Sequence, residues 1–180
     1  EVTVLVTAGV RGNAQRTSQD EGSYYNHGTI NVIVLTNRRL TPQAMLRTII
    51  TATEAKSAAL MDMDIRSTYS GLINGATGTG TDNVLVVRGE GPIEEYAGGH
   101  TKAGELIARA VYAGVTEAIL KQNGIRSSRD IFQRLKERGL SMDQIAGSFS
   151  NGADKERVVN ELEGLLREPY YSAFIESTLA

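Results

Sequence analysis

The sequence predicts an α/β fold in which a mixed β-sheet is packed by long helices and followed by an all-helical C-terminal extension. Up to about residue 120, short β-branched runs alternate with long segments of helical periodicity, which is typical of a sheet covered by helices. The remainder, from Ile125 to Ala180, contains helix-capping residues and no strand-like run. We therefore expect a first domain at residues 1–124 and a helical extension at residues 125–180.

Three apolar runs are expected to form the strands. Val2–Val6 is rich in β-branched residues and leads into a turn that contains glycines. Residues 29–36 form a near-continuous apolar run, which is typical of a strand in a sheet covered on both faces. Asn83–Val87 is the third run, and a glycine-rich turn follows it. The polar stretch 12–28 lacks an apolar period and is expected to be a long loop.

Two long helices are expected to pack on these strands. The first has Thr41 as its N-cap and Pro42 at its first helical position, and it is expected to run to about Leu60. The second begins near Thr101 and ends at the Asn-Gly pair 123–124. Each helix repeats apolar residues at helical spacing and so has a face that can contact the sheet.

The C-terminal extension carries several helix signals. Ser127 and Asp130 have the spacing of a capping box, and so do Ser141 and Gln144. Pro169 is expected to end another helix, because proline has no main-chain N–H to continue the helical hydrogen bonds of the residues before it. The extension is therefore expected to consist of several short helices.

The charge pattern of the extension bears on its partners. Residues 127–149 vaguely resemble a helix-turn-helix, but residues 126–157 carry seven basic and five acidic side chains, which is a poor electrostatic match for DNA. The extension is better suited to oligomerisation, so we leave a homo-oligomer open and expect no nucleic-acid partner.

Composition excludes several classes of chemistry. With 19 basic and 21 acidic residues the net charge is -2, so nothing favours general attraction to nucleic acid or an anionic membrane. The absence of cysteine excludes disulfides, thiol nucleophiles and thiolate metal ligands. The longest apolar runs are far shorter than the roughly 20 residues that span a bilayer, and no signal peptide opens the sequence. We expect a cytoplasmic protein without a membrane partner.

Residues 74–82, Asn-Gly-Ala-Thr-Gly-Thr-Gly-Thr-Asp, resemble a phosphate-binding loop, because glycines let main-chain amides approach an anion. A Walker loop needs a lysine before its Ser/Thr, and a dinucleotide loop needs a third glycine that opens a helix. Here the loop leads into a strand, and Asn83 takes the place of that glycine. Two interpretations stay open: a turn whose threonines bind their own backbone, and a site loop that presents Thr79, Thr81 and Asp82.

Two charged residues lie on the first expected helix. Glu54 and Lys56 are two positions apart and point about 200° away from one another, so they do not form a local ion pair. Each is either a solvated charge or a member of a site.

The sequence contains two histidines, His27 and His100, and each lies beside a glycine in an expected loop. His100, at the start of the second helix, is the better candidate for proton transfer, and the alternative is a capping or surface histidine. No His or Cys cluster has metal-ligand spacing, so we predict no metal site.

Five segments occur in an order that resembles the CbiZ family of adenosylcobinamide amidohydrolases. They are residues 2–14, 28–35, 50–60, 76–82 and 96–112. The fourth reads Ala-Thr-Gly-Thr-Gly-Thr-Asp, and the fifth begins Tyr-Ala-Gly-Gly-His-Thr-Lys. The resemblance covers roughly residues 2–120 and departs from the family pattern at Gly99, where a lysine usually precedes the histidine.

The resemblance implies hydrolysis of adenosylcobinamide to adenosylcobyric acid and aminopropanol, a step of corrinoid salvage for cobalamin synthesis in archaea and some bacteria. The partner is then a small corrinoid substrate that itself holds cobalt, and no further cofactor is expected. Amide cleavage needs an activated nucleophile, a stabilised oxyanion and a proton for the leaving amine. We assign activation of water to Glu54, Asp82 or Glu105, and protonation of the amine to His100.

The remaining roles concern substrate binding. Thr79 and Thr81, with the amides of the glycine loop, are expected to hold the oxyanion. Lys56 is expected to favour the ionised form of nearby carboxylates. The predicted substrate-binding set is completed by Asn13, Asn31 and Thr101.

Two alternatives stay open. The order of strand, long helix, Thr/Asp-rich loop and strand also faintly resembles self-processing hydrolases of the ornithine acetyltransferase and DmpA aminopeptidase kind. Those enzymes use an N-terminal Ser or Thr as nucleophile, and Glu1 is not such a residue. The other alternative is a corrinoid-binding or regulatory module without catalysis, which would bind a corrinoid without converting it.

Overall fold

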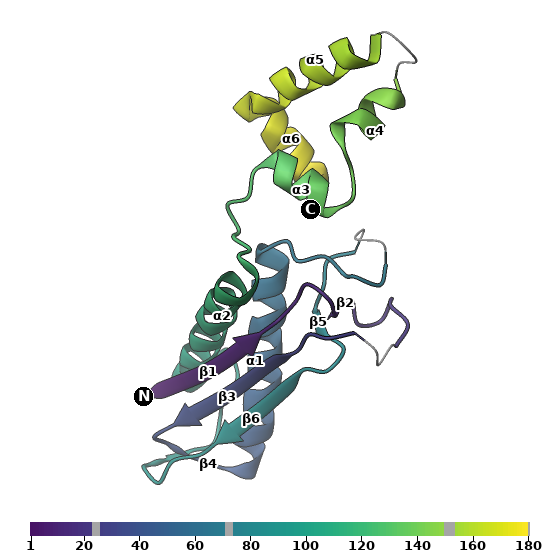
Figure 1. Ribbon diagram of the computed structural model, residues 1–180. Helices are drawn as coiled ribbons and strands as arrows, with labels where there is room; N and C mark the ends of the chain where they lie inside the picture. The colour runs from purple at the N-terminus through teal and green to yellow at the C-terminus, as the bar shows by residue number, and fades with distance from the viewer. Residues whose placement is uncertain (23–25, 71–73, 150–153, 180) are drawn as a thin grey trace. The chain divides into compact units, whose positions relative to one another are not determined.

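The computed structural model describes residues 1–22, 26–70, 74–149 and 154–179, and the chain divides into two compact units, Glu1–Ser127 and Ser128–Ala180. The first unit contains a sheet in the order β1-β3-β6 (Figure 1), formed by β1 (Val2–Ala8), β3 (Ile30–Thr36) and β6 (Asn83–Val87). β1 is antiparallel to β3, and β3 is parallel to β6. The predicted mixed α/β fold is confirmed.

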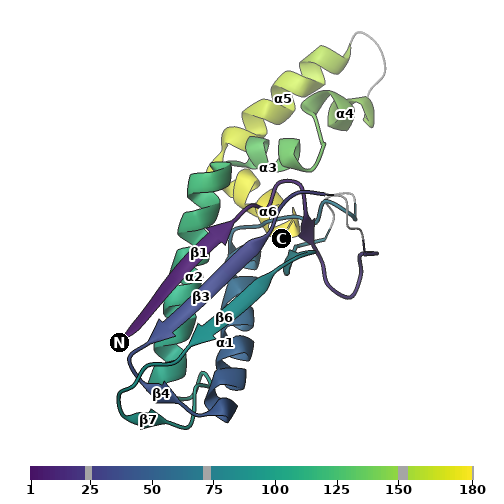
Figure 2. The same ribbon diagram turned by 60° about the horizontal axis from the view of Figure 1, so that its bottom comes forward.

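Two long helices, α1 (Pro42–Asp62) and α2 (Lys102–Asn123), cover one face of this sheet (Figures 1 and 2). Threonine side chains cap both helices: Thr41 was predicted as a cap, and Thr101 lies where the second helix was expected to begin. Thr41 Oγ1 accepts a hydrogen bond from Ala44 N at 3.2 Å, and Thr101 Oγ1 accepts one from Gly104 N at 3.0 Å. No helix in the described residues is both long enough and apolar enough to cross a membrane.

The core lies between these helices and the sheet. Alternate residues of the strands point into it, so Val32 and Val34 of β3 are almost fully buried. Ala52 of α1 and Val111 of α2 are also inaccessible to solvent. The close packing of α2 on β1 requires a small residue at Gly114, where an added Cβ would lie 2.8 Å from Val6 Cγ2.

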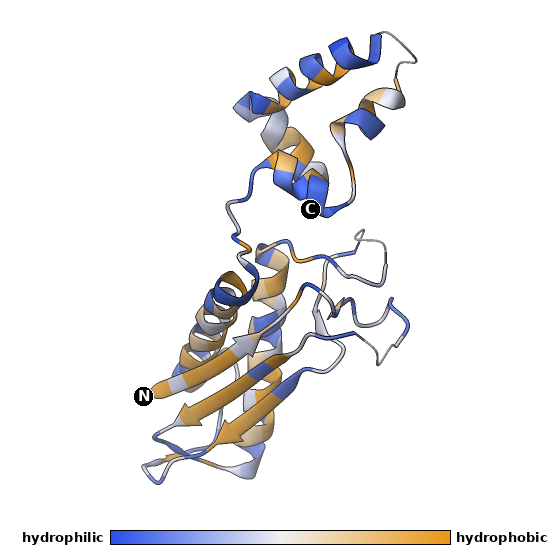
Figure 3. Cartoon of the chain, viewed as in Figure 1, coloured by the Kyte–Doolittle hydropathy of each residue, from blue (hydrophilic) through white to orange (hydrophobic). Residues whose placement is uncertain are grey.

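The other face of the sheet is open within the described residues. Leu5 of β1 and Leu85 of β6 are each 56% exposed, and Ile33 of β3 is only partly buried. Figure 3 shows that all three strands are rich in apolar residues. Within the described residues of the first unit, the expectation that residues 29–36 are covered on both faces is therefore wrong, because both long helices pack on the same side.

Four two-residue strands lie at the ends of the sheet. Residues 14–15 (β2) and 78–79 (β5) pair antiparallel, within segments that were predicted to be loops. Residues 39–40 (β4) and 93–94 (β7) pair in parallel. The pairing of β2 with β5 joins the segments that precede β3 and β6. Residues 23–25, within the expected loop 12–28, lie outside the described residues, and so do residues 71–73, which precede the glycine-rich segment 74–82.

The second unit consists of helices in the described residues, as predicted. They are α3 (Ile131–Glu137), α4 (Met142–Gly147), α5 (Lys155–Arg167) and α6 (Pro169–Leu179). The proline at position 169 separates α5 from α6, as expected, and is also the first residue of α6.

One of the two capping boxes predicted for this unit is present. Ser141 and Gln144 cap α4 reciprocally, as predicted. The proposed box of Ser127 with Asp130 is wrong, because Asp130 is itself the N-cap of α3. Its carboxylate accepts from Gln133 N at 2.8 Å, since the helix begins one residue after the aspartate.

Candidate active site

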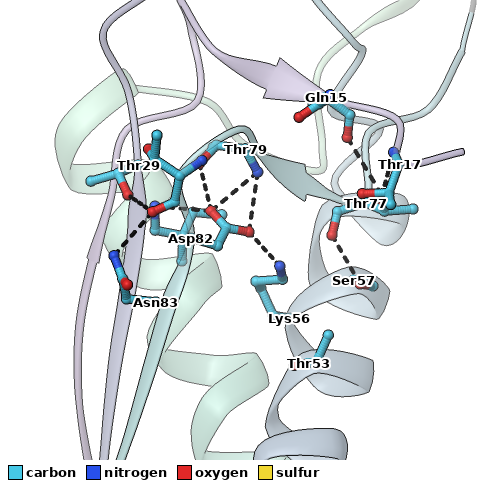
Figure 4. A network of polar contacts seen from close by, with 12 residues as sticks. Gln15, Thr17, Thr29, Thr53, Lys56, Ser57, Thr77, Thr79, Asp82 and Asn83 are labelled. Atoms are coloured by element: carbon cyan, nitrogen blue, oxygen red, sulfur yellow. Dashed lines mark hydrogen bonds and ion pairs between the residues drawn. The ribbon is translucent and has the colours of Figure 1, made fainter. Parts of the chain in front are cut away.

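A buried ion pair joins α1 to the residues that precede β6. Lys56 Nζ contacts Asp82 Oδ2, and the two side chains are only 9% and 14% exposed (Figure 4). Lysine and aspartate are rarely buried unless they are paired, and breaking such a pair is costly. The interpretation of Lys56 as a solvated surface charge is therefore excluded.

The carboxylate of Asp82 also gathers donors from the loop before it and from β3. Thr79 donates its main-chain N–H to both carboxylate oxygens at 3.1 Å, and its hydroxyl to Oδ1 at 2.5 Å. The main-chain N–H of Ile30 donates to Oδ1 at 3.2 Å. Together with Lys56, these donors fix the Thr79–Asp82 loop against the amino end of β3.

Gly78 lets this ion pair lie directly against the main chain. A Cβ atom at position 78 would lie 2.3 Å from Asp82 Oδ2 and 2.7 Å from Lys56 Nζ, closer than any real contact. The glycine-rich composition of this loop thus has a specific cause. It makes room for a buried carboxylate and ammonium, and this supports the interpretation of the loop as part of a site.

The ammonium of Lys56 has hydrogen-bonding capacity to spare. An ammonium carries three N–H donors, and in the described part of the chain Nζ has one acceptor, Asp82 Oδ2. Buried donors without acceptors are costly in folded proteins. Two N–H groups of Lys56 are therefore available to a carbonyl oxygen or a water molecule at this position.

Asn13 lies beside the same loop and is fully buried. Its Nδ2 donates to Gly28 O at 2.7 Å, and its Oδ1 accepts from the Tyr69 hydroxyl. A Cβ atom at Gly80 would lie 3.1 Å from Asn13 Oδ1, so the asparagine contacts the loop that carries Thr79. Tyr69 was missed by the sequence analysis, because a single tyrosine in an irregular segment belongs to no pattern.

A row of polar side chains extends from this loop onto the open face of the sheet. Thr81 O accepts from Thr29 Oγ1 at 2.8 Å and from Asn83 Nδ2 at 3.0 Å. Asn83 Nδ2 also donates to Asn31 Oδ1 at 3.3 Å, and Asn31 Nδ2 donates to Thr7 Oγ1 at 3.1 Å. We call these five residues the polar row. The predicted binding residues Asn31 and Thr81 belong to it.

Two predicted catalytic residues are not joined to this cluster by any hydrogen bond or ion pair within the described residues. Glu54 is exposed on α1, whereas Lys56 is buried, as their angular separation predicts. His100 lies against Gly98, and so does Arg47: a Cβ atom at Gly98 would be 3.0 Å from His100 Nδ1 and 3.1 Å from Arg47 Nε.

Two further predicted residues have local partners at the start of α2. Thr101 caps the helix and also donates to Gly98 O at 2.9 Å. Glu105 pairs with Lys102 at 2.9 Å and Arg109 at 3.1 Å, on the helix surface. The hydrogen bond with Lys102, together with the two positive charges, lowers the pKa of Glu105. Within the described residues, no three His, Cys, Asp or Glu side chains are close enough to hold a metal ion.

Comparison with known proteins gives the cluster its context. Residues 1–127 match the family described as adenosylcobinamide amidohydrolase. The chain therefore belongs to this family. The match spans the first unit and contains every residue of the site that was predicted from the sequence.

Two curated relatives are similar to this chain. An "uncharacterized protein MJ1613" of Methanocaldococcus jannaschii is 43% identical over 143 residues, which are 69% of this chain and 56% of the relative. An "adenosylcobinamide amidohydrolase" of Methanosarcina mazei is 34% identical over 124 residues, which are 63% of this chain and 54% of the relative. The chain thus spans about half the length of these relatives. No solved structure matches it.

Proposed function

We propose that this chain carries the catalytic site of an adenosylcobinamide amidohydrolase, which releases aminopropanol and adenosylcobyric acid in corrinoid salvage. The observation that carries this proposal is the buried Lys56–Asp82 pair against Gly78 and Thr79, inside the segment that matches the family. The name of the Methanosarcina mazei relative, adenosylcobinamide amidohydrolase, supports the reaction. In this proposal the cobalt corrinoid is the substrate, and no resident cofactor takes part.

Lys56 supplies electrostatic stabilisation. Its two unpaired N–H groups donate to the oxygen of the scissile carbonyl, which becomes negative in the tetrahedral intermediate. Because the side chain is buried, this interaction is stronger than it would be in water. Asp82 holds the ammonium in place before the substrate arrives, so little reorganisation is needed during the reaction.

The polar row is proposed to hold the body of the substrate. Asn31 and Asn83 lie on the open face of the sheet with Thr7, next to the loop that carries Asp82. A corrinoid carries neutral carboxamide side arms around a large ring, and asparagine side chains match such amides as both donors and acceptors. The exposed apolar side chains of Leu5 and Leu85 on the same face provide a surface for the ring.

The experiment compares two lysine variants in turnover of adenosylcobinamide. Lys56→Met removes the proposed oxyanion donor, whereas Lys121→Met changes a lysine that is 73% exposed on α2. Product acid and aminopropanol are measured by mass spectrometry, and folding by circular dichroism and thermal unfolding. We expect wild type and Lys121→Met to form product at similar rates, and Lys56→Met to lose activity by at least about a hundredfold.

Other outcomes would contradict the proposal. Equal turnover by both variants would place the chemistry away from Lys56. Tight binding of adenosylcobinamide by the wild type without any product would favour the corrinoid-binding module over the enzyme.

A further inference from the structure

We infer that the hydroxyl of Thr79 is the nucleophile of this site and forms an ester with the substrate before water completes hydrolysis. The inference rests on the proposed function and deepens it. From the sequence we predicted that a water molecule attacks the amide, whereas here a side chain of the protein attacks first. It depends on how Thr79, Asp82 and Lys56 are connected.

The three side chains form a continuous chain of contacts. Thr79 Oγ1 donates to Asp82 Oδ1 at 2.5 Å, and Asp82 Oδ2 contacts Lys56 Nζ (Figure 4). A distance of 2.5–2.7 Å is characteristic of a strong bond between a hydroxyl and a carboxylate. A hydroxyl that is bonded to a base, which in turn is held by a third group, is the arrangement that activates a nucleophile.

The surroundings of Asp82 favour Thr79 over water as the attacking group. A general base must lie within hydrogen-bond reach of the proton that it removes. Oδ1 already accepts from the hydroxyl and the N–H of Thr79 and from the N–H of Ile30, while Oδ2 accepts from Lys56 and again from the N–H of Thr79. The hydroxyl proton within direct reach of this carboxylate is that of Thr79.

Thr79 is also held in position before any substrate binds. It lies in β5, where it pairs with Ala14 of β2, and it is 92% buried. The hydrogen bonds from the main-chain N–H and the hydroxyl of Thr79 to Asp82 would also occur in an ordinary turn, since threonine and aspartate commonly bond to nearby main chain. A turn does not require a buried lysine with unused donors, and this lysine is what distinguishes the site.

The reaction balances without an additional reactant. Thr79 Oγ bonds to the carbonyl carbon, its proton passes to Asp82, and the carbonyl oxygen becomes an oxyanion held by Lys56. When the intermediate collapses, the C–N bond breaks, and the proton on Asp82 moves to the nitrogen of the departing aminopropanol. The corrinoid remains as an ester of Thr79. Water then adds to the ester and gives one proton to Asp82. The C–O bond to Thr79 breaks, the proton moves from Asp82 to Thr79 Oγ and restores the hydroxyl, and the corrinoid leaves as the free acid.

Hydroxylamine tests for this ester. If wild-type protein forms an acyl intermediate, hydroxylamine competes with water for it, so part of the acid is replaced by corrinoid hydroxamate. Aminopropanol release is measured in parallel. Because aminopropanol leaves before water and hydroxylamine compete for the ester, we expect hydroxylamine to leave the rate of its release unchanged. We expect hydroxamate to rise with hydroxylamine concentration while total acid plus hydroxamate continues to match aminopropanol.

Substitutions at position 79 locate the intermediate. We expect Thr79→Ser to retain turnover and hydroxamate formation, and Thr79→Val to slow aminopropanol release by at least about a hundredfold with unchanged folding. Thr53→Val serves as the matched control, because the Thr53 hydroxyl is exposed and bonds to Ile49 O of its own helix. This control is expected to behave as wild type.

Failure of the Thr79 nucleophile and failure of the proposed function give different experimental results. Acid as the sole product in hydroxylamine, or near-normal turnover by Thr79→Val, would overturn the nucleophile and leave the amidohydrolase intact. Absence of any acid from wild-type protein would overturn the proposed function, and the nucleophile with it.

Discussion

Ser57 Oγ donates a hydrogen bond of 2.9 Å to Thr77 O, directly beside the position where Lys56 contacts Asp82. Two consecutive residues of α1 therefore hold the two ends of the loop 77–82. The helix is itself packed into the hydrophobic core through its buried alanines, including Ala52 and Ala59. The site thus depends on a rigid helix rather than on the glycine-rich loop alone, which is the arrangement that best preserves catalytic geometry.

This attachment makes Gly78 sensitive to substitution. We expect Gly78→Ala to separate Lys56 from Asp82, because the new Cβ would overlap both, and to destabilise the protein by about 1–3 kcal/mol. Turnover should fall by at least tenfold. Gly75→Ala is the control, since its Cβ would have no atom within 4 Å. Thermal unfolding and product formation measure both effects, and equal behaviour of the two variants would contradict the packing argument.

The ion pair itself can be tested by a double-mutant cycle. Lys56→Met leaves the Asp82 carboxylate buried without its charged partner, and we expect this single change to cost about 3–5 kcal/mol of unfolding free energy. Adding Asp82→Asn removes the unpaired charge and should recover part of that stability. Activity should stay lost in the double variant. Denaturant unfolding of all four proteins measures the coupling, and strictly additive losses would indicate that the pair contributes nothing to stability.

The carboxylate of Asp20 makes the free energy of unfolding depend on pH. Burial alone would raise the pKa of Asp20, but hydrogen bonds from the Ser67 hydroxyl and the Arg16 amide outweigh burial and lower it below 3.8. The folded state therefore favours the ionised form. This contribution to stability is present above about pH 4 and is lost as the pH falls through the lowered pKa.

Unfolding free energies measured from pH 7 to pH 2 test this assignment. We expect Asp20→Asn to be less stable than wild type at neutral pH and to show a shallower decline on acidification. Glu21→Gln changes an exposed neighbour and should retain the wild-type slope. Identical slopes for wild type and Asp20→Asn would show that Asp20 does not contribute to acid sensitivity.

The sequence-based prediction and the proposed mechanism differ in the role that they give to His100. The sequence predicts it as the acid for the leaving amine, whereas the mechanism returns the proton through Asp82. Because His100 lies against Gly98 and has no hydrogen bond to the Lys56–Asp82 cluster within the described residues, we expect His100→Gln to change turnover by less than about threefold. A loss of a hundredfold or more, together with a lost basic limb in the pH profile, would establish the histidine as the general acid.

The helices and strands of this fold could be predicted from the sequence where the repeat of apolar residues was long enough to detect. The β-branched runs form β1, β3 and β6. The N-cap at Thr41 and the expected start near Thr101 located both long helices. The pairing of β2 with β5 was not readable, because strands of two residues have no measurable alternation. The open sheet face was also missed, since an apolar run does not reveal how many layers cover it.

The sequence predicted which residues belong to the candidate site better than it predicted their contacts with one another. Lys56, Asp82, Thr79 and Thr81 were selected from the sequence, and the structure brings them together with Asn13 and Asn31. That Lys56 would pair with a residue 26 positions away is a tertiary contact that no local pattern encodes. The roles of Glu54, His100, Thr101 and Glu105 stay predictions.

The polar row offers a test of substrate binding that is independent of the chemical step. Asn83→Ala removes an exposed amide that bonds to Asn31 and Thr81 O, yet it leaves the Lys56–Asp82 pair unchanged. If the row holds carboxamide arms equally in the ground and transition states, its loss raises KM and leaves kcat nearly constant. We expect KM for adenosylcobinamide to rise about tenfold. Thr3→Ala, an exposed position near the start of β1, is the control and should leave KM unchanged. A fall in kcat at constant KM would instead assign Asn83 to the chemistry, because only a contact made in the transition state alone produces that pattern.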